Sequence, residues 1–397
     1  MDPAIVLFDL DGVLVRPGGY RAAVVGSMQE LLARMELDAP PPTRLVCALF
    51  ESIGITSEWD MVPVALAIVL NAVARHAKTP LPAVSLPDVM AWIRERRLTN
   101  VQVDYENSVR ALQGLVTTRV TPALFLYHRI LSGDLQHIFP HLGNQPFLRD
   151  LLADTRNPAQ SVTMRLVQSH VLGREVFEQT YEIPAEISVD STLLALDHPA
   201  LEPDLGHRLL ARHAAGSMRL CAFTARPSLP PRDGGFSRKG FSPEAELALR
   251  LIGFQDIPLM GYGRLIAFGD RYAVSPDSIL KPAPLQSLAA AVAAVTGQEW
   301  AALEWAREYL DNVNRGGLLH LPQGFPRKFE LHVFEDASVG IRGGQAAAEL
   351  FRLCGAEVTY HPWGIATIAD KEAALVAAGA PVFPDVNHAL RAAFPDL

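Results

Sequence analysis

AIVLFDLDG, residues 4–12, joins five apolar residues to two aspartates and a glycine. An apolar run of this length predicts a strand buried on both faces, as in a parallel sheet. Because alternate side chains of an extended chain point the same way, Asp9 and Asp11 can converge on one point, and Gly12 lets the chain turn away. Two carboxylates so close need a cation or a proton between them. An ordinary turn at a strand end remains the alternative, since Asp and Gly are common there.

A second apolar run, RLCAF at residues 219–223, predicts another short strand. It is followed by a hydroxyl, a small residue and a cation: Thr224, Ala225 and Arg226. A hydroxyl and exposed backbone N–H groups at the end of a strand can bind a phosphate oxygen.

Two later segments add a cation and further acids. Lys281 precedes a proline at the head of the helical stretch 285–295 and would supply positive charge to a phosphate. ELHVFED, residues 330–336, predicts a third strand that ends in Glu335 and Asp336. These acids would complete a cage of oxygen ligands for Mg²⁺.

Taken in chain order, the four segments resemble the four sequence motifs of the haloacid dehalogenase-like (HAD) superfamily. The resemblance covers roughly the first sixteen residues and everything after about residue 216. It implies that Asp9 is the nucleophile, that Asp11 is a general acid and base, and that the last acids bind Mg²⁺. The site residues expected from it are, for catalysis, Asp9, Asp11, Thr224 and Lys281; for substrate binding, Gly12, Thr224, Ala225, Arg226 and Lys281; and for the metal, Asp9, Asp11, Glu335 and Asp336.

The last motif indicates a branch of this superfamily. FEDASVGI, residues 334–341, looks like the Glu-Asp-Ser-x-x-Gly-Ile form found in capped phosphatases and phosphomutases, with Ala337 where serine is frequent. Dehalogenases of the superfamily lack the second aspartate of the first motif. Asp11 therefore favours phosphoryl chemistry over cleavage of a carbon–halogen bond.

The predicted fold is α/β, with a doubly wound, mostly parallel sheet of the Rossmannoid kind and a large inserted helical cap. We expect the HAD-like catalytic core at residues 1–16 and 216–397, with a helical and loop insertion at about 298–328, and the α-helical cap domain at 17–215. Helical periodicity supports the cap, because six apolar residues fall on one helical face: Ala23, Val24, Met28, Leu31, Leu32 and Met35.

Within the predicted cap, the sequence identifies functional residues less clearly. Asp60 fits either a helix N-cap or a residue that faces an active site. Two roles are open for Arg165, Gln168 and His170: contact with a phosphorylated ligand, or a purely structural role. The apolar stretch 61–74 falls short of the ~20 residues of a membrane span and predicts a buried helix, capped by Asp60 with Pro63 in its first turn.

Composition narrows the function classes. The chain has 397 residues, of which 49% are hydrophobic and 20% charged, and its net charge of −8 comes with no basic stripe, which argues against nucleic acid. Its three cysteines, Cys47, Cys221 and Cys354, lie far apart, so a disulfide framework is not expected. No secretory signal precedes the first strand, and the expected location is the cytoplasm.

The function that we expect is a Mg²⁺-dependent phosphatase, a phosphoric monoester hydrolase that cleaves a small phosphorylated metabolite through an aspartyl-phosphate. A phosphomutase or phosphotransferase using the same aspartyl-phosphate is the main alternative, and a non-catalytic binding protein on this fold is another. No nucleic acid or membrane partner is expected, and the protein is expected to be a monomer or homodimer.

Overall fold

The chain folds into two compact units and crosses between them twice. The computed structural model describes residues 3–115, 121–143, 145–314 and 320–397. Unit 1 contains Met1–Pro17 and Asp197–Leu397, and unit 2 contains Gly18–Leu196. The return to unit 1 lies earlier than the expected position near residue 216. The reason is that helix α11 (Pro203–Ala214) packs Leu205 and Leu209 into the core beside the sheet.

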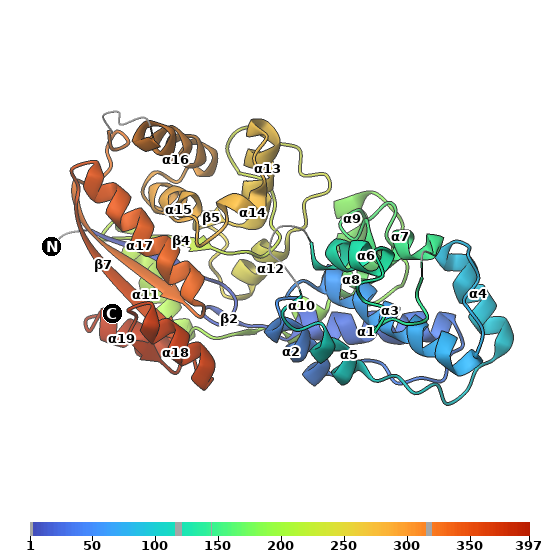
Figure 1. Cartoon of the computed structure of the whole chain (residues 1–397). Helices are drawn as coiled ribbons and strands as arrows, with labels where there is room; N and C mark the ends of the chain where they lie inside the picture. The colour runs from blue at the N-terminus through green and yellow to red at the C-terminus, as the bar shows by residue number, and fades with distance from the viewer. Residues whose placement is uncertain (1–2, 116–120, 144, 315–319) are drawn as a thin grey trace. The chain divides into compact units, whose positions relative to one another are not determined.

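Unit 1 consists of strands that alternate with helices (Figure 1). Its strands are β1 (Ala4–Phe8), β2 (Val15–Arg16), β3 (His198–Pro199), β4 (Met218–Phe223), β5 (Leu259–Met260), β6 (Lys328–Glu335), β7 (Glu357–Ile365) and β8 (Val382–Phe383). Its helices are α11, α12 (Glu244–Leu251), α13 (Tyr262–Tyr272), α14 (Pro276–Ile279), α15 (Pro284–Thr296), α16 (Glu299–Asn314), α17 (Ser338–Leu353), α18 (Ala369–Ala377) and α19 (Val386–Ala393).

Six of these strands form one sheet in the order β5-β4-β1-β6-β7-β8, and each neighbouring pair is parallel. β1 is central because all five of its residues are apolar and buried, as a strand covered on both faces requires. The short strands β2 and β3 pair antiparallel in a separate ribbon. The predicted α/β class with a mostly parallel sheet is confirmed.

Helices cover both faces of the sheet. Ile5 and Leu7 of β1 point into a core formed with α15, α16 and α17, while Val6 and Phe8 point into a second core formed with α11, α12 and α19. The alternation follows from the period of two in a strand. Within the predicted insertion at 298–328, α16 packs Trp300 and Trp305 against the first core, and residues 315–319 lie outside the described part.

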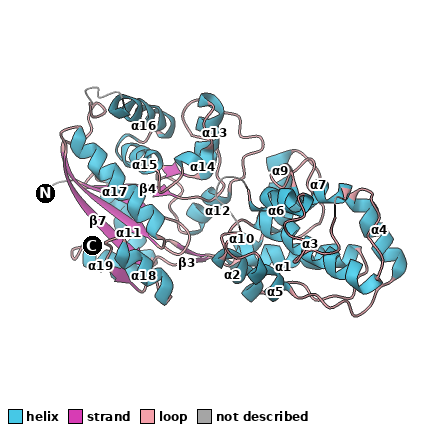
Figure 2. Ribbon diagram, in the orientation of Figure 1, coloured by secondary structure: helices cyan, strands magenta, loops and turns pink. Residues whose placement is uncertain are grey.

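Every regular element in the described part of unit 2 is a helix (Figure 2). The helices are α1 (Gly19–Arg34), α2 (Arg44–Ser52), α3 (Glu58–Ala77), α4 (Leu86–Arg96), α5 (Tyr105–Ala111), α6 (Pro122–Leu131), α7 (Pro146–Leu152), α8 (Val162–Leu172), α9 (Arg174–Tyr181) and α10 (Thr192–Leu196). The predicted apolar face of α1 is buried, including Val24, Met28 and Leu31.

Helix α3 is longer than the apolar stretch suggested. It spans 20 residues, and by length and composition alone it is apolar enough to cross a membrane, but 78% of its most apolar window is buried inside the structure. A core helix has the same pattern. Its N-cap is Ser57, whose hydroxyl accepts the Trp59 N–H, so the predictions of Asp60 as the cap and of Pro63 in the first turn were wrong.

Candidate functional site

The predicted motif residues follow three neighbouring strands of the sheet. Asp9 follows β1, Thr224 follows β4, and Glu335 ends β6. Since β1 pairs in parallel with both other strands, these residues emerge at the same edge of the sheet. The Asp9 N–H donates to the Phe334 carbonyl oxygen at 3.0 Å, which fixes the start of the turn after β1. In open α/β sheets, ligands bind outside this edge, at the carboxyl ends of the strands.

Lys281 places its ammonium group between two buried carboxylates. Its Nζ lies 2.9 Å from Asp9 Oδ1 and 2.5 Å from Glu335 Oε1. The side chain of Lys281 is 7% exposed and that of Glu335 is fully buried. Because a buried charge is costly unless it is paired, each of these groups depends on the others.

Carboxylates outnumber the lysines paired with them at this site, three to two, with Lys281 on Asp9 and Glu335 and Lys371 on Asp336. Asp9, Glu335 and Asp336 offer carboxylate oxygens that lie within 4.8 Å of one another. Burial raises the pKa of Asp9 to about 6, with Lys281 opposing the rise and Asp336 adding to it. Burial likewise raises the pKa of Glu335 to about 8, again against Lys281. An excess of negative charge in a buried place favours binding of a proton or a cation.

These three carboxylates form a donor set that fits Mg²⁺, which prefers oxygen ligands and is commonly held by one or two carboxylates together with substrate phosphates. Asp336 also makes an ion pair with Lys371 of α18, whose Nζ lies 2.5 Å from its Oδ2. Gly12 has a φ of +78°, and a Cβ there would lie 2.6 Å from the same Asp336 oxygen. Any larger residue at position 12 would therefore clash with the Asp336 carboxylate.

The spacing between the acids and Gly340 in the last motif has a steric cause. A Cβ at Gly340 would lie inside the Glu335 carboxylate, 1.8 Å from Oε1. The other oxygen, Oε2, accepts the Ala337 N–H at 3.2 Å. Only a glycine lets the first turn of α17 approach the buried acid this closely.

Asp11 is paired with a guanidinium and does not belong to the group formed by Asp9, Glu335 and Asp336. Arg226 Nε and Nη2 donate to its two oxygens at 2.7 and 2.6 Å. The same Nη2 donates to Asp197 Oδ2 at 2.7 Å. The side chains of Arg226 and Asp197 are each 2% exposed, whereas that of Asp11 is 32% exposed. Arg226, which the sequence analysis expected to bind substrate, holds Asp11 in this structure. Asp11, which was expected to bind the metal, is not part of the group of possible metal ligands formed by Asp9, Glu335 and Asp336.

Gln286 of α15 connects the parts of the site and was missed by the sequence analysis. Its Nε2 donates to the Thr224 carbonyl at 3.0 Å and to the Met260 carbonyl at 2.9 Å, while its Oε1 accepts the Lys281 N–H at 3.1 Å. The Thr224 hydroxyl accepts the Arg226 N–H at 3.1 Å. Ala225, between them, is exposed in the turn after β4.

The candidates in unit 2 make contacts that are explained within that unit. Asp60 is buried and accepts hydrogen bonds from Arg156 Nη2 at 2.7 Å and from the Ala123 N–H at 3.2 Å. Gln168 accepts the Tyr181 hydroxyl at 3.3 Å. His170 packs against Gly26, and burial lowers its pKa.

A second group of possible metal ligands lies within the sheet: Glu330, His332 and His361. Trp363 Nε1 donates to His332 Nδ1 at 3.1 Å, so Nε2 is the nitrogen that carries the proton in neutral His332 and donates to Glu330 at 3.1 Å. A metal would need that nitrogen free of its proton. The group therefore fits a hydrogen-bonded network better than a metal centre.

Among protein-family models no match was found, and among curated proteins none was found either. A solved structure with the same fold is the X-ray structure of a target of the Northeast Structural Genomics Consortium. It is similar to this chain with a TM-score of 0.63 and 14% sequence identity, over 100% of this chain and 99% of that one. At this identity the likeness shows the fold alone, over both units.

A second solved structure is a phosphatase from Thermococcus thioreducens, with a TM-score of 0.40 and 14% identity over 90% of this chain and 91% of that one. A likeness this distant supports no conclusion about this chain.

Proposed function

We propose that the protein is a Mg²⁺-dependent phosphatase that hydrolyses a small phosphorylated metabolite. The observation that carries the proposal is the position of Asp9. It lies at the carboxyl end of the central strand, paired with the buried Lys281 and grouped with Glu335 and Asp336. An ionised carboxylate among charges that can neutralise a phosphate is the arrangement that phosphoryl transfer to an aspartate needs.

In the first step an Asp9 oxygen attacks phosphorus in line, and the bond from phosphorus to the ester oxygen breaks. For Asp11 to act as the acid, one of its oxygens leaves Arg226 and carries the proton that passes to the departing oxygen, so an alcohol leaves and an aspartyl-phosphate remains. Lys281 and the Thr224 hydroxyl provide a positive charge and a hydrogen-bond donor for the phosphoryl oxygens. Proton transfer by a positioned carboxyl group is worth about 10²–10⁴-fold.

In the second step Asp11, now a carboxylate, removes a proton from the water that attacks phosphorus. The bond from phosphorus to Asp9 breaks, which frees inorganic phosphate and restores both carboxyl groups. Arg226 and Asp197 hold Asp11 in a fixed orientation for this work. Bound Mg²⁺, held by Asp9, Asp336 and Glu335, would supply charge stabilisation that Lys281 and Lys371 do not complete for three carboxylates.

The test is phosphate release from a panel of sugar phosphates and other small phosphate esters, with and without Mg²⁺. Asp9→Asn keeps the size of the side chain but removes the nucleophile, so kcat should fall by about 10⁴-fold or more. Asp270→Asn is the matched control, because Asp270 is exposed on α13 and belongs neither to the carboxylate group of the site nor to the ion pairs of Lys281. It should keep full activity.

Other outcomes would point elsewhere. Isomerised or transferred product without free phosphate would replace the phosphatase by a phosphomutase or phosphotransferase. Hydrolysis that survives Asp9→Asn would show that Asp9 is not the nucleophile. Activity that survives removal of divalent ions with EDTA would remove the metal from the proposal.

A further inference from the structure

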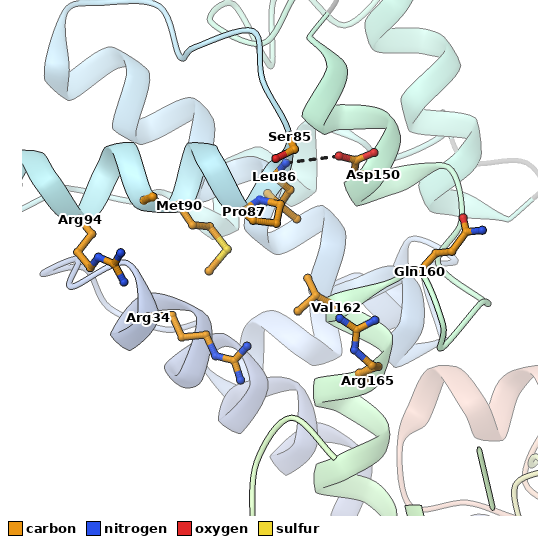
Figure 3. A pocket seen from close by; sticks show the side chains of 11 residues that line it. Arg34, Ser85, Leu86, Pro87, Met90, Arg94, Asp150, Gln160, Val162 and Arg165 are labelled. Atoms are coloured by element: carbon orange, nitrogen blue, oxygen red, sulfur yellow. Dashed lines mark hydrogen bonds between the residues drawn. The ribbon is translucent and has the colours of Figure 1, made fainter. Parts of the chain in front are cut away.

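Unit 2 contains a cavity of about 590 Å³ that is lined by none of the residues proposed for phosphoryl transfer. Figure 3 shows side chains from four helices around it: Arg34 of α1, Met90 and Arg94 of α4, Asp150 of α7, and Val162 and Arg165 of α8. Sites for small molecules typically have volumes of about 300–1,000 Å³. The cavity therefore has the size of a ligand site.

One wall of the cavity is apolar. Leu86, Met90 and Ala91 of α4 face it together with Val162, the first residue of α8. Methionine is flexible and polarisable and adapts to the shape of a bound group. Apolar chain placed against this wall would leave water with the usual gain of the hydrophobic effect.

Two of the cationic groups are fixed by one acid. Glu186 Oε1 accepts Arg165 Nε at 2.6 Å, and its Oε2 accepts Arg34 Nη1 at 2.9 Å. Arg34 Nε also donates to Glu30 at 2.8 Å. Burial alone would raise the pKa of Glu186, but the two arginines lower it below its ordinary value. Arg34 and Arg165 are thus held as a rigid, charge-compensated part of the rim.

Arg94 is the cation without such compensation. Among the described residues no hydrogen bond or ion pair engages its guanidinium. The acid that lines the cavity, Asp150, is at the other end of α4, where its Oδ2 accepts the Leu86 N–H at 3.4 Å. At a rise of 1.5 Å per residue, Leu86 and Arg94 are about 12 Å apart along the helix. The cavity therefore has an uncompensated positive end and an apolar wall.

We propose that this cavity binds a small organic anion, a carboxylate with an apolar chain, whose charged group pairs with Arg94 and whose chain lies against Met90, Ala91 and Val162. The binding does not depend on the phosphatase proposal, because none of the lining residues acts on phosphate. A guanidinium recognises a carboxylate through paired, charge-assisted hydrogen bonds.

The test uses octanoate as the probe and isothermal titration calorimetry on the full chain. Its uncharged analogue octan-1-ol tests the need for the charge, and butanoate tests the need for the chain. Each buried methylene group strengthens binding about fourfold, so octanoate should bind at least tenfold tighter than butanoate. It should also bind about two- to fivefold tighter than octan-1-ol, because Arg94 is exposed and exposed ion pairs contribute little.

Two variants locate the binding. Arg94→Glu should weaken octanoate at least fivefold and leave octan-1-ol nearly unchanged, because it replaces an attracting charge by a repelling one and leaves the apolar wall in place. Ala91→Trp places an indole against the apolar wall, where the chain of the probe would lie, and should weaken both probes. Arg110→Glu is the matched control: Arg110 is exposed on α5 and does not line the cavity, so the same charge reversal should leave binding unchanged.

Both variants alter partly or fully exposed positions, and thermal unfolding verifies that they fold. The proposal is overturned if octan-1-ol binds the wild type as tightly as octanoate. It is equally overturned if folded Arg94→Glu and Ala91→Trp bind octanoate as the wild type does, or if octanoate does not bind.

Discussion

At the scale of single residues, the acid beside the proposed nucleophile is held by partners that are distant in sequence. Arg226 takes both oxygens of Asp11 and is itself held by the buried Asp197. Two carboxylates on one guanidinium fix the plane in which Asp11 lies. In the proposed reaction, Asp197 is therefore a positioning residue that acts through Arg226.

Asp197→Asn tests this arrangement. The amide has the same size but a weaker hold on the guanidinium, so Asp11 loses its fixed orientation. We expect kcat to fall about tenfold with little change in KM, and the pH–rate profile to shift, since a charge near the proposed acid and base is removed. The substitution should also lower the free energy of unfolding by about 2 kcal/mol, because it weakens the buried ion pair between Asp197 and Arg226.

Steady-state kinetics between pH 5 and pH 9 and thermal unfolding provide these measurements. Asp204→Asn, at an exposed position at the start of α11, is the matched control and should behave as the wild type. A variant that is less stable yet has an unchanged kcat and pH–rate profile would reduce Asp197 to a structural role.

At the scale of elements, the sequence predicts those parts of the site that follow a strand. β1 and β4 are mainly apolar and are followed by polar residues, and β6 alternates polar and apolar residues before it ends in Glu335. Asp9, Thr224 and Glu335 could therefore be placed together before the structure was known. Asp197 and Gln286 could not be placed in this way. Their contacts join segments far apart in the chain and follow no local pattern, because they depend on how the helices pack.

The return crossing was misplaced for a related reason. The predicted cap was extended to residue 215 because the second motif begins only after it. α11 has the alternating apolar and polar faces of any surface helix, and this pattern does not say which core the apolar face joins. Its packing beside β4 is determined by tertiary contacts, which the sequence pattern of the helix does not reveal.

Helix α18 places a cation where the metal is proposed to bind. Lys371 pairs with Asp336, and its side chain is 50% exposed. Lys371→Met removes this competitor, so Mg²⁺ should bind the substrate-free protein about two- to fivefold more tightly, in keeping with the small worth of exposed ion pairs. Calorimetric titration with Mg²⁺ measures the change without any turnover.

Lys371→Arg retains the positive charge and is the matched control, with Mg²⁺ affinity near that of the wild type. If Lys371→Met binds Mg²⁺ no better than Lys371→Arg, the lysine does not compete with the ion for Asp336.

At the scale of the whole molecule, the buried acids link folding stability to pH. A carboxyl group whose pKa is higher in the folded state holds its proton more tightly there, so its contribution is complete at low pH and is lost as the pH rises through the folded value. For Asp9 this window runs from 3.8 to about 6, and for Glu335 from 4.5 to about 8. The raised pKa of Lys281 adds nothing in this range, because the lysine stays charged throughout.

In EDTA, the midpoint of thermal unfolding should therefore fall between pH 5 and pH 8.5. Asp9 alone accounts for about 1 kcal/mol of this fall, because pH 5 lies only one unit below its folded pKa of about 6. Mg²⁺ should restore more stability at pH 8 than at pH 5.5, since it binds the ionised acids. Differential scanning fluorimetry across this range measures both effects.

Asp9→Asn and Glu335→Gln each remove one titrating group and should flatten the pH dependence, whereas Asp270→Asn should not. Equal slopes in the wild type and in both site variants would contradict the assignment of the effect to these acids.

The pairing of β1 has a consequence for synthesis on the ribosome. β1 forms hydrogen bonds only with β4 and β6 among the described strands, and β4 begins at Met218. At a typical rate of 5–20 residues per second, β4 leaves the ribosome about 10–40 s after β1. During that interval the unpaired AIVLF segment is an exposed, uncharged sequence with high β propensity, open to association with other nascent chains. This exposure follows from an architecture in which the central strand is synthesised before both strands that pair with it.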